Sequence, residues 1–530
     1  MNMFKLTAVA AALFLAAFNP AAAQWQAPNH SVPVGQGAGV TGFKSAAPGA
    51  TGLPLTSNGA TSDPSFQAIG NAAFGTTVPA NTYKCNPTSS PGALQDCTNS
   101  SASVPGTYFV LCTGSGDSTA LNAALAAAEA ISPAGGTLKI SGKCSISSPL
   151  APTSGVAIRG DAMNQTFLQP TTSSISCINN NPTSASSVDI SDITCSYATL
   201  SSSGAIGIQY GNATINSIGG KIERVNCTNC TTGIFCENCI NVEINAPNIG
   251  PFYNYGIEVS SPVSPDSGGV IIHDGYIQNF SPATNSSIGI YWLSGGAFDV
   301  HDMQIFDATG IYIHQSLQTS ELNLHHNLFS GTGTPTAAVQ VDALNANYAC
   351  TVSGTALSTS GGSGTIAIGQ TATCNGTNLG QIVSGSGLSW VTTNSASTSG
   401  TGSSTFQMTE LHIDDNIFDS TTRSVYIPNT IGGEYFLFNL TMNGNLTSST
   451  NNSGLNQFTV YNTQGIAMNG NVIKCNGTCT GGRPIFFDSS TDHVGIFQPR
   501  SMEPGSWGAT DIISSTNTCG MSTNALLTGC

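Results

Sequence analysis

Residues 270–277 read VIIHDGYI, and five later stretches of the chain repeat the same order of apolar and polar positions. The copies are FDVHDMQI (298–305), LNLHHNLF (322–329), LHIDDNIF (411–418), LTMNGNLT (440–447) and IAMNGNVI (466–473). Where nothing is inserted, their starts lie 28, 24, 29 and 26 residues apart. One unit of this length cannot bury its own apolar side, so the repeat predicts units that stack into a solenoid.

Most copies precede a second short apolar run that reads as a strand. These runs are GIYW (289–292), GIYI (310–313), AVQV (338–341) and SVYI (424–427), with GIFC (233–236), VEIN (242–245) and GIEV (256–259) before them. Alternation with a period of two points Val270 and Ile272 inward and His273 outward. A β-propeller needs four strands per repeat and a longer period, so a parallel β-helix is the better interpretation.

Asparagine recurs at the third polar position of the later copies. Asn327, Asn416, Asn445 and Asn471 occupy it. Asparagine tolerates the left-handed backbone conformation, so we expect these residues to form the bend between two strands. We also expect their stacked amides to form a hydrogen-bonded ladder.

The start of the solenoid carries a separate signal. Residues 116–150, GDSTALNAALAAAEAISPAGGTLKISGKCSISSPL, predict a helix from about Leu121 to Ala130, a stop at Gly135 and Gly136, and then a strand. With the repeat, this opening resembles the pectate-lyase-like superfamily of right-handed parallel β-helix proteins, over roughly residues 110 to 500. The resemblance implies an all-β solenoid with an N-terminal capping helix, and a polysaccharide as substrate or ligand.

The remaining segments divide the chain. Residues 1–23 read as a bacterial Sec-type signal peptide, with Lys5, an apolar run from Leu6 to Phe18 and a small-residue cleavage site before Gln24. This predicts a secreted, periplasmic or cell-surface protein. The other predicted parts are a Gly-, Pro- and Ser-rich stalk resembling phage tail fibres (24–108), β-helix (109–344), a small β insertion (345–410), the last rungs (411–500) and a C-terminal cap (501–530).

The charge balance limits the partners. Twelve Lys and Arg residues against 27 Asp and Glu give a net charge of −15. So few cations cannot neutralise a row of phosphates, which excludes nucleic acid as a partner class. The apolar run near the N-terminus is too short to span a bilayer, so no membrane insertion is expected. A neutral glycan fits this surface, whereas an anionic glycan needs a bridging cation or a local basic spot.

Sixteen cysteines fit an oxidising destination. Several are near neighbours, which predicts pairs Cys85 with Cys97, Cys177 with Cys195, Cys350 with Cys374, Cys475 with Cys479, and Cys519 with Cys530. Cys227, Cys230, Cys236 and Cys239 have a spacing that suits either disulfides or Zn²⁺. An exported chain favours disulfides.

Alignment of the six copies produces a column of ionisable residues. The first polar position holds His273, His301, His325, Asp414, Asn443 and Asn469, and the second holds Asp274, Asp302, His326, Asp415, Gly444 and Gly470. Rungs lie about 4.8 Å apart, so these groups fall on one edge. They form either a structural turn ladder or a functional cluster able to perform acid–base chemistry or to hold Ca²⁺. The predicted catalytic residues are Asp414, Asp415, His325, His326, His301 and Asp302, with Arg423 as a cationic partner.

A second column follows on the next strand. Its outward positions are Glu258, Tyr291, Tyr312, Gln340 and Tyr426, with Trp292 and Tyr255 nearby. Exposed aromatic rings on one face suit sugar rings, which makes Tyr291, Trp292, Tyr312, Tyr426 and Glu258 the predicted substrate-binding residues. The alternative is that the tyrosines stack on one another and stabilise the sheet.

Two functions follow from these columns and from the resemblance. One is a polysaccharide lyase or glycoside hydrolase, and the other is a non-catalytic adhesin or structural β-helix like a tail fibre. Asp414-Asp415 matches the acidic pair of polygalacturonases, but their Gly-His-Gly and Arg-Ile-Lys elements are absent from this sequence. A homotrimer, common among β-helix spikes, has no motif of its own in this chain.

Overall fold

The computed structural model describes residues 106–475 apart from short gaps, and isolated strands before and after that range. The gaps are 132–134, 154, 181–186, 261–267, 280–286, 307–308, 316–320, 332–336, 420, 429–435, 450–454. The expected signal peptide, most of the expected stalk, and the expected pairs of Cys85 with Cys97, Cys475 with Cys479 and Cys519 with Cys530 lie outside the described residues or side chains. Among the described residues, no helix combines the length and apolar character needed to cross a bilayer.

Contacts divide the chain into two units, Met1–Thr98 and Asn99–Cys530. In the first unit the described residues form three antiparallel strand pairs. The pairs are β1 (Val32–Gly35) with β2 (Phe43–Ala46), β3 (Leu55–Thr56) with β4 (Ser65–Phe66), and β5 (Thr82–Cys85) with β6 (Gln95–Thr98).

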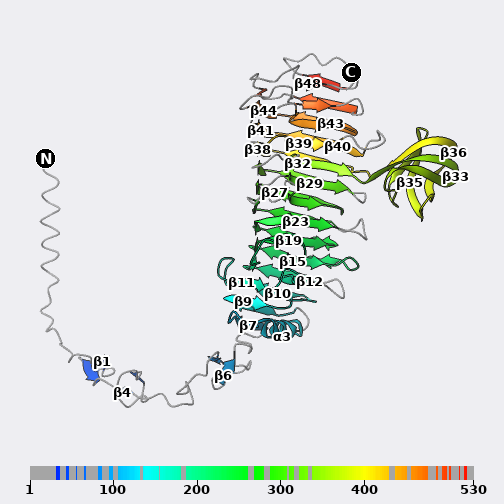
Figure 1. Ribbon diagram of the computed structural model, residues 1–530. Helices are drawn as coiled ribbons and strands as arrows, with labels where there is room; N and C mark the ends of the chain where they lie inside the picture. The colour runs from blue at the N-terminus through cyan, green and yellow to red at the C-terminus, as the bar shows by residue number, and fades with distance from the viewer. Residues whose placement is uncertain are drawn as a thin grey trace, which may run out of the picture. The chain divides into compact units, whose positions relative to one another are not determined.

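The second unit is a right-handed parallel β-helix whose successive rungs stack strand on strand (Figure 1). Its three parallel sheets have 14, 12 and 11 strands. The first sheet contains β7 (Thr107–Leu111), β8 (Thr137–Ser141), β10 (Val156–Arg159), β13 (Val188–Ser191), β17 (Lys221–Glu223), β21 (Glu243–Asn245), β24 (Val270–His273), β27 (Phe298–His301), β30 (Leu322–His325), β37 (Leu411–Asp414), β40 (Leu437–Asn443), β43 (Thr463–Asn469), β46 (Asp492–Phe497) and β49 (Thr518–Met521).

The other two sheets complete each rung. The second sheet contains β9 (Lys143–Ile146), β11 (Phe167–Pro170), β14 (Thr194–Ser196), β18 (Asn226–Thr228), β22 (Asn248–Ile249), β25 (Tyr276–Gln278), β28 (Gln304–Phe306), β31 (Leu328–Ser330), β38 (Ile417–Asp419), β41 (Leu446–Ser449), β44 (Val472–Cys475) and β47 (Ser501–Met502). The third sheet contains β12 (Ile178–Asn180), β15 (Ile206–Gly211), β19 (Cys230–Glu237), β23 (Phe252–Ser260), β26 (Ile288–Trp292), β29 (Thr309–Gln315), β32 (Val339–Ala343), β39 (Val425–Ile427), β42 (Phe458–Val460), β45 (Ile485–Phe487) and β48 (Ile512–Ile513). A short pair, β16 (Ser217–Ile218) with β20 (Cys239–Ile240), lies outside them.

A helix closes one end of the solenoid, as the sequence predicts. Helix α3 (Ser118–Glu129) buries Leu121, Leu125 and Ala128 over the first rung (Figure 1). Asp117 precedes the helix, and its carboxylate accepts hydrogen bonds from the backbone N–H groups of Thr113, Gly114 and Ser145. These bonds lower the pKa of Asp117 despite its burial, so an ionised side chain fixes the helix start to the β-helix.

A four-stranded antiparallel sheet interrupts the last rungs. It consists of β33 (Asn345–Gly364), β34 (Thr371–Cys374), β35 (Thr377–Ser386) and β36 (Ser389–Thr405), and we refer to it as the insertion. The insertion projects sideways from the β-helix (Figure 1). Because it loops out, β30 pairs directly with β37, and His325 lies opposite Asp414.

Alternation places the apolar residues inside, as expected. Val270 and Ile272 are buried, and the same positions stay buried in the next rungs. Aromatic residues stack along the axis as well: the rings of Phe329 and Phe418 lie parallel with centroids 5.1 Å apart. Each rung thus covers the apolar face that its neighbour cannot bury alone, which is the source of the fold's stability.

The turn between the first and second sheets contains the expected amide ladder. The side-chain amide of Asn327 donates to Asn416 Oδ1 at 3.0 Å, Asn416 to Asn445 at 3.2 Å, and Asn445 to Asn471 at 3.0 Å. The left-handed conformation, however, belongs to the preceding residue and not to asparagine. Positive φ angles occur at Asp274, Asp302, His326, Asp415, Gly444 and Gly470. Each ladder asparagine is buried and uses its side-chain amide in the ladder, so the left-handed bend lies at the exposed residue before it.

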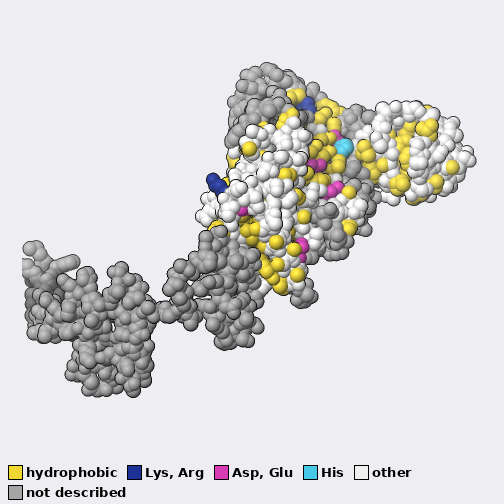
Figure 2. Space-filling view, turned by 60° about the horizontal axis from the view of Figure 1, so that its bottom comes forward, with side chains coloured by type: hydrophobic (Ala, Val, Ile, Leu, Met, Phe, Trp, Pro, Cys, Tyr) yellow, Lys and Arg dark blue, Asp and Glu magenta, His cyan; other side chains and the backbone are white. Residues whose placement is uncertain are grey.

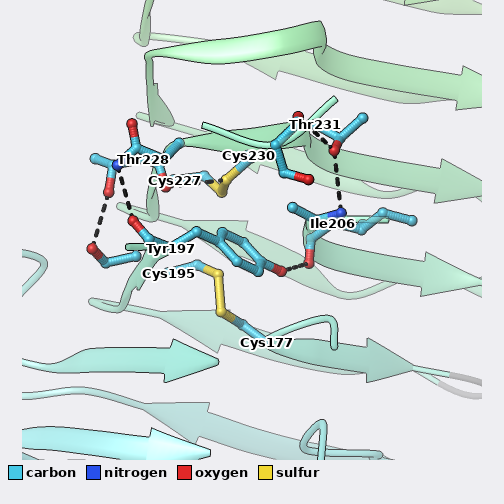
Figure 3. The surroundings of a disulfide bond; sticks show 12 residues. Cys177, Cys195, Tyr197, Ile206, Cys227, Thr228, Cys230 and Thr231 are labelled. Carbon is cyan, nitrogen blue, oxygen red and sulfur yellow. Dashed lines mark hydrogen bonds between the residues drawn. A yellow bond between two sulfur atoms is a disulfide. The ribbon is translucent and has the colours of Figure 1, made fainter. Parts of the chain in front are cut away.

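Five disulfides lie within the described part of the second unit, four in the β-helix and one in the insertion. Cys177 pairs with Cys195 and Cys350 with Cys374, as predicted. The four closely spaced cysteines form two disulfides in place of the zinc alternative, Cys227–Cys230 (Figure 3) and Cys236–Cys239. A further disulfide joins Cys112 to Cys144, which the sequence spacing did not suggest. Beside the Cys177–Cys195 disulfide, the hydroxyl of Tyr197 donates to the carbonyl of Ile206 at 2.6 Å (Figure 3).

Candidate functional site

The predicted column of ionisable residues exists and follows the outer face of the first sheet. His273 lies opposite His301, His301 opposite His325, and His325 opposite Asp414, with Asn443 and Asn469 next. The imidazoles stack nearly parallel, with centroid distances of 4.9 Å and 5.0 Å. We call this set and its turn neighbours the His/Asp column.

A second outward column runs beside it, two residues earlier on each strand. It contains Glu243, Ile271, Asp299, Asn323, His412 and Thr441. Sequence reasoning missed Asp299 and His412 as site residues. The alternation that points His301 outward also points Asp299 outward, so the signal was present in the pattern.

Carboxylates orient the first two imidazoles. Both ring nitrogens of His273 face carboxylate oxygens, of Asp274 at 2.8 Å and of Glu243 at 3.0 Å, so this ring is fully engaged. The Nδ1 atom of His301 lies 2.9 Å from Asp302 Oδ2. This hydrogen bond lowers the pKa of Asp302, and an ionised carboxylate can only accept, so Nδ1 of His301 carries a proton.

The third imidazole connects to a fourth at the turn. His325 Nδ1 lies 3.1 Å from His326 Nδ1, and His325 Nε2 lies 3.2 Å from Asp299 Oδ1 in an electrostatic contact without hydrogen-bond alignment. The Asp299 carboxylate favours a proton on His325 Nε2. Nδ1 of a neutral His325 then accepts from His326 Nδ1–H. His326 Nε2 is left to face outward, 3.9 Å from Asp415 Oδ2.

The two aspartates of the next rung are held differently. Asp414 Oδ1 accepts the backbone N–H of Asn443 at 2.8 Å, which fixes its carboxylate. Asp415 is more exposed, with 60% of its side chain accessible. A Cβ at Gly444 would lie 1.9 Å from Asp415 Oδ1, so the glycine makes room for this carboxylate.

These groups surround a shallow depression. Its volume is about 340 Å³, and its lining residues are Asn323, Leu324, His325, His326, His412, Asp414 and Asp415. Figure 2 shows acidic side chains and histidine on the β-helix face beside the insertion. The structure thus brings together four predicted residues (His325, His326, Asp414 and Asp415), and it places His301 and Asp302 one rung further along. None of the described lining residues is Lys or Arg.

Asp302, Asp414 and Asp415 supply carboxylate oxygens, the kind of ligand that Ca²⁺ binds. Within the described part of the chain, no three His, Cys, Asp or Glu side chains converge in a way that would hold a metal ion. The carboxylate of Asp302 is instead hydrogen-bonded to His301, that of Asp414 to the backbone N–H of Asn443, and Asp415 lies 3.9 Å from His326.

The predicted tyrosine column also exists, on the outer face of the third sheet. Glu258 lies opposite Tyr291, then follow Tyr312, Gln340 and Tyr426 in register. The rings of Tyr255 and Tyr291 stack at 4.8 Å with an angle of 12°. Tyr291 and Tyr312 also contact each other, with centroids 5.4 Å apart and planes tilted by 45°. Tyr255, Tyr291 and Tyr312 therefore pack on one another, as the structural alternative expects.

Trp292 does not belong to this surface. Its side chain is fully buried and packs on Phe298, with ring centroids 4.0 Å apart. The residue follows Tyr291 directly, so alternation along the strand turns it into the core. The prediction that Trp292 contacts substrate is wrong.

Arg423 belongs to the tyrosine face and not to the aspartates. It precedes β39, whereas Asp414 ends β37, and β38 lies between them in the rung. Its guanidinium lies 4.3 Å from the ring centre of Tyr426, a cation–π contact. No ion pair joins it to Asp414 or Asp415 among the described side chains, so the predicted cationic partnership is wrong.

Burial changes the acid–base properties of the tyrosine face. Glu258 is packed among the aromatic rings, and desolvation together with the charge of Glu237 raises its pKa to about 7. Desolvation also raises the pKa values of Tyr291 and Tyr312, which stay protonated. The Tyr312 hydroxyl donates to Asp342 Oδ2 at 2.8 Å.

In comparisons with known proteins, this chain resembles several solved structures in fold. No protein-family model and no curated protein matches the chain. An alpha-1,3-glucanase from Streptomyces thermodiastaticus is 15% identical, with 77% of this chain and 67% of that chain covered and a TM-score of 0.41. The tailspike protein of E. coli bacteriophage HK620, solved in complex with a pentasaccharide, is 10% identical over 73% and 64%, at 0.41. A mannuronan C-5 epimerase module of Azotobacter vinelandii is 12% identical over 78% and 97%, at 0.35.

Proposed function

We propose that this protein is exported, binds a neutral polysaccharide along the outer face of the first sheet, and hydrolyses it at the depression beside β30 and β37. The observation that carries the proposal is the register that gathers His325, His326, Asp414 and Asp415, from both sides of the insertion, into one depression. In a chain with 7% charged residues, this concentration needs a reason.

The roles follow from the contacts. When His326 carries both ring protons, its Nε2–H faces outward and can protonate the leaving glycosidic oxygen, while Asp415 stabilises the imidazolium. Asp414 is the carboxylate that accepts a proton from the attacking water. The water oxygen joins the anomeric carbon, the bond to the leaving sugar breaks, and solvent returns the proton from Asp414 to His326.

The lining favours a neutral substrate over a uronate. A uronate chain would bring rows of carboxylates to Asp414 and Asp415 without a Lys or Arg in the lining to compensate them. Lyases act by β-elimination next to such a carboxylate, so hydrolysis suits this depression better. The disulfides of the β-helix fit the oxidising compartment that an exported protein reaches.

The test is turnover on neutral and uronate polysaccharides, read as reducing ends and as absorbance of unsaturated uronides. We expect reducing ends without unsaturated products, and their loss in His326→Gln and in Asp414→Asn. His273→Gln is the matched control, because that ring is already engaged by two carboxylates. Unsaturated products would identify a lyase, and retention of glycan without turnover would identify the adhesin.

A further inference from the structure

The insertion differs chemically from the β-helix that carries it. From Ala343 to Thr409 the sequence contains no Asp, Glu, Lys, Arg or His. The insertion has its own small core, which includes Tyr348, Leu357 and Trp390 and is separate from the core of the β-helix. Its exposed surface is mostly Ser, Thr, Asn and Gly, with exposed apolar side chains at Ile368, Val383, Leu388 and Val391.

A depression of about 560 Å³ lies among β33, β34 and β36 of this insertion. This volume falls within the roughly 300–1,000 Å³ typical of small-molecule pockets. Its lining residues are Asn347, Tyr348, Ala349, Gly362, Thr373, Gly376, Thr401, Gly402 and Ser403. It shares no lining residue with the depression of the His/Asp column.

The walls of this depression are fixed. The Cys350–Cys374 disulfide joins β33 to β34 beside it, and the Tyr348 hydroxyl donates to the carbonyl of Ser403 at 2.7 Å. A Cβ at Gly402 would lie 2.3 Å from the carbonyl oxygen of Thr373, so only glycine allows this close approach of strands. A preformed wall spares a ligand the cost of ordering it.

The groups at the rim suit hydroxyl-rich ligands. Asn347 and Thr401 lie directly opposite Ser403 and Ala349 in the β33–β36 register, and no hydrogen bond within the described residues uses the Asn347 amide or the Thr401 hydroxyl. An ionic ligand would find no counter-charge on the insertion. A purely apolar ligand would leave these amide and hydroxyl groups unpaired.

We propose that this depression binds a neutral sugar unit of a glycan, as a second carbohydrate site that is independent of chemistry at the His/Asp column. Asn347 and Thr401 pair with sugar hydroxyls, and the glycine-rich wall lets the ring approach the backbone. The insertion then holds the protein on a glycan whether or not the β-helix cleaves it.

The test uses the full chain and immobilised neutral gluco-, manno- and galacto-oligosaccharides beside uronic-acid oligosaccharides. Ala349→Trp fills the depression from the exposed side of β33. Ser353→Trp, also exposed on β33 but outside the lining, is the matched control. We expect at least tenfold weaker retention of a neutral oligosaccharide by Ala349→Trp, unchanged retention by Ser353→Trp, and unchanged turnover of soluble substrate in both.

A second variant, Asn347→Leu, removes only the amide and is expected to weaken the same retention without filling the depression. Equal retention by wild type, Ala349→Trp and Asn347→Leu would overturn the proposal. So would an absence of retention on every neutral probe, or a preference for the uronic-acid probes. If the wild-type protein retained the neutral oligosaccharide but turned over no substrate, the result would count against the proposed hydrolase and would still support this second site.

Discussion

The outer faces of the first and third sheets are built by the same rule and end with opposite chemistry. Both carry one residue type stacked through successive rungs, histidine on the first and tyrosine on the third. On the first face carboxylates lie beside the imidazole rings, and the hydrogen bond from His301 lowers the pKa of Asp302. On the third face Glu258 lies beside Tyr291, and burial together with the charge of Glu237 raises its pKa. Repetition sets the columns, and the neighbours of each column set its acid–base behaviour.

The largest expected effect separates the two faces by activity. His326→Gln and Asp414→Asn should each lower kcat by roughly 10²- to 10⁴-fold, the range for loss of general acid–base catalysis. Tyr312→Phe on the third face should leave kcat within about threefold, because only the contacts of its hydroxyl with Asp342 and His314 are lost. The measurement is reducing-end release under saturating substrate. A comparable loss of kcat in the variants of both faces would contradict the assignment of catalysis to the first face alone.

Stability should respond most where the ladder lies beneath the His/Asp column. Asn416→Ala removes the acceptor of Asn327 and the donor to Asn445, and should cost about 1–3 kcal/mol per buried group left unpaired. Ser424→Ala, at a buried hydroxyl that contacts Gln457 beside the tyrosine face, is the control. It should cost about 1 kcal/mol and leave turnover intact. Urea unfolding midpoints measure the costs. Equal costs for the two variants would show that the ladder stabilises the fold no more than one ordinary buried hydrogen bond does.

The third face predicts a stability that falls as pH rises. The pKa of Glu258 is about 7 in the folded chain, above its ordinary value of 4.5, so the folded state binds the proton more tightly. The advantage over the unfolded chain is complete below the ordinary value and is lost as pH rises to about 7. Melting temperature against pH should therefore decline less in Glu258→Gln than in wild type. Parallel curves would show that Glu258 is solvated.

The smallest expected effect lies on the first face and has the opposite sign. The hydrogen bond from His301 lowers the pKa of Asp302, so its stabilisation is present above the ordinary carboxyl pKa and disappears as pH falls through the lowered value. The Asp302 side chain is half exposed, so Asp302→Asn should cost less than about 1 kcal/mol at neutral pH and nothing in acid. Paired unfolding curves at the two pH values test this, and a cost that persists in acid would assign the effect to packing.

The sequence determined the fold and the membership of both columns. The repeat beginning at Val270 fixed the stacking, because a rung of that length has no other way to cover its apolar side. The period of two pointed His273 and Tyr291 outward, and it also contained the signal for Trp292, which the alternation turns into the core. It further determined that the Asn residues form a ladder, although the bend falls one residue earlier.

Only the tertiary structure decided which side chains meet. Arg423 is close to Asp414 in sequence, yet the chain passes from the first sheet through the second to the third between them. The Arg423 guanidinium therefore packs on Tyr426. Asp299 and His325 are distant in sequence, yet lie 3.2 Å apart across neighbouring rungs. The burial that raises the pKa of Glu258 likewise comes from rings on other strands. Contacts and desolvation depend on distances in space. A repeat pattern gives these distances only for equivalent residues in successive rungs, and not for residues of different columns.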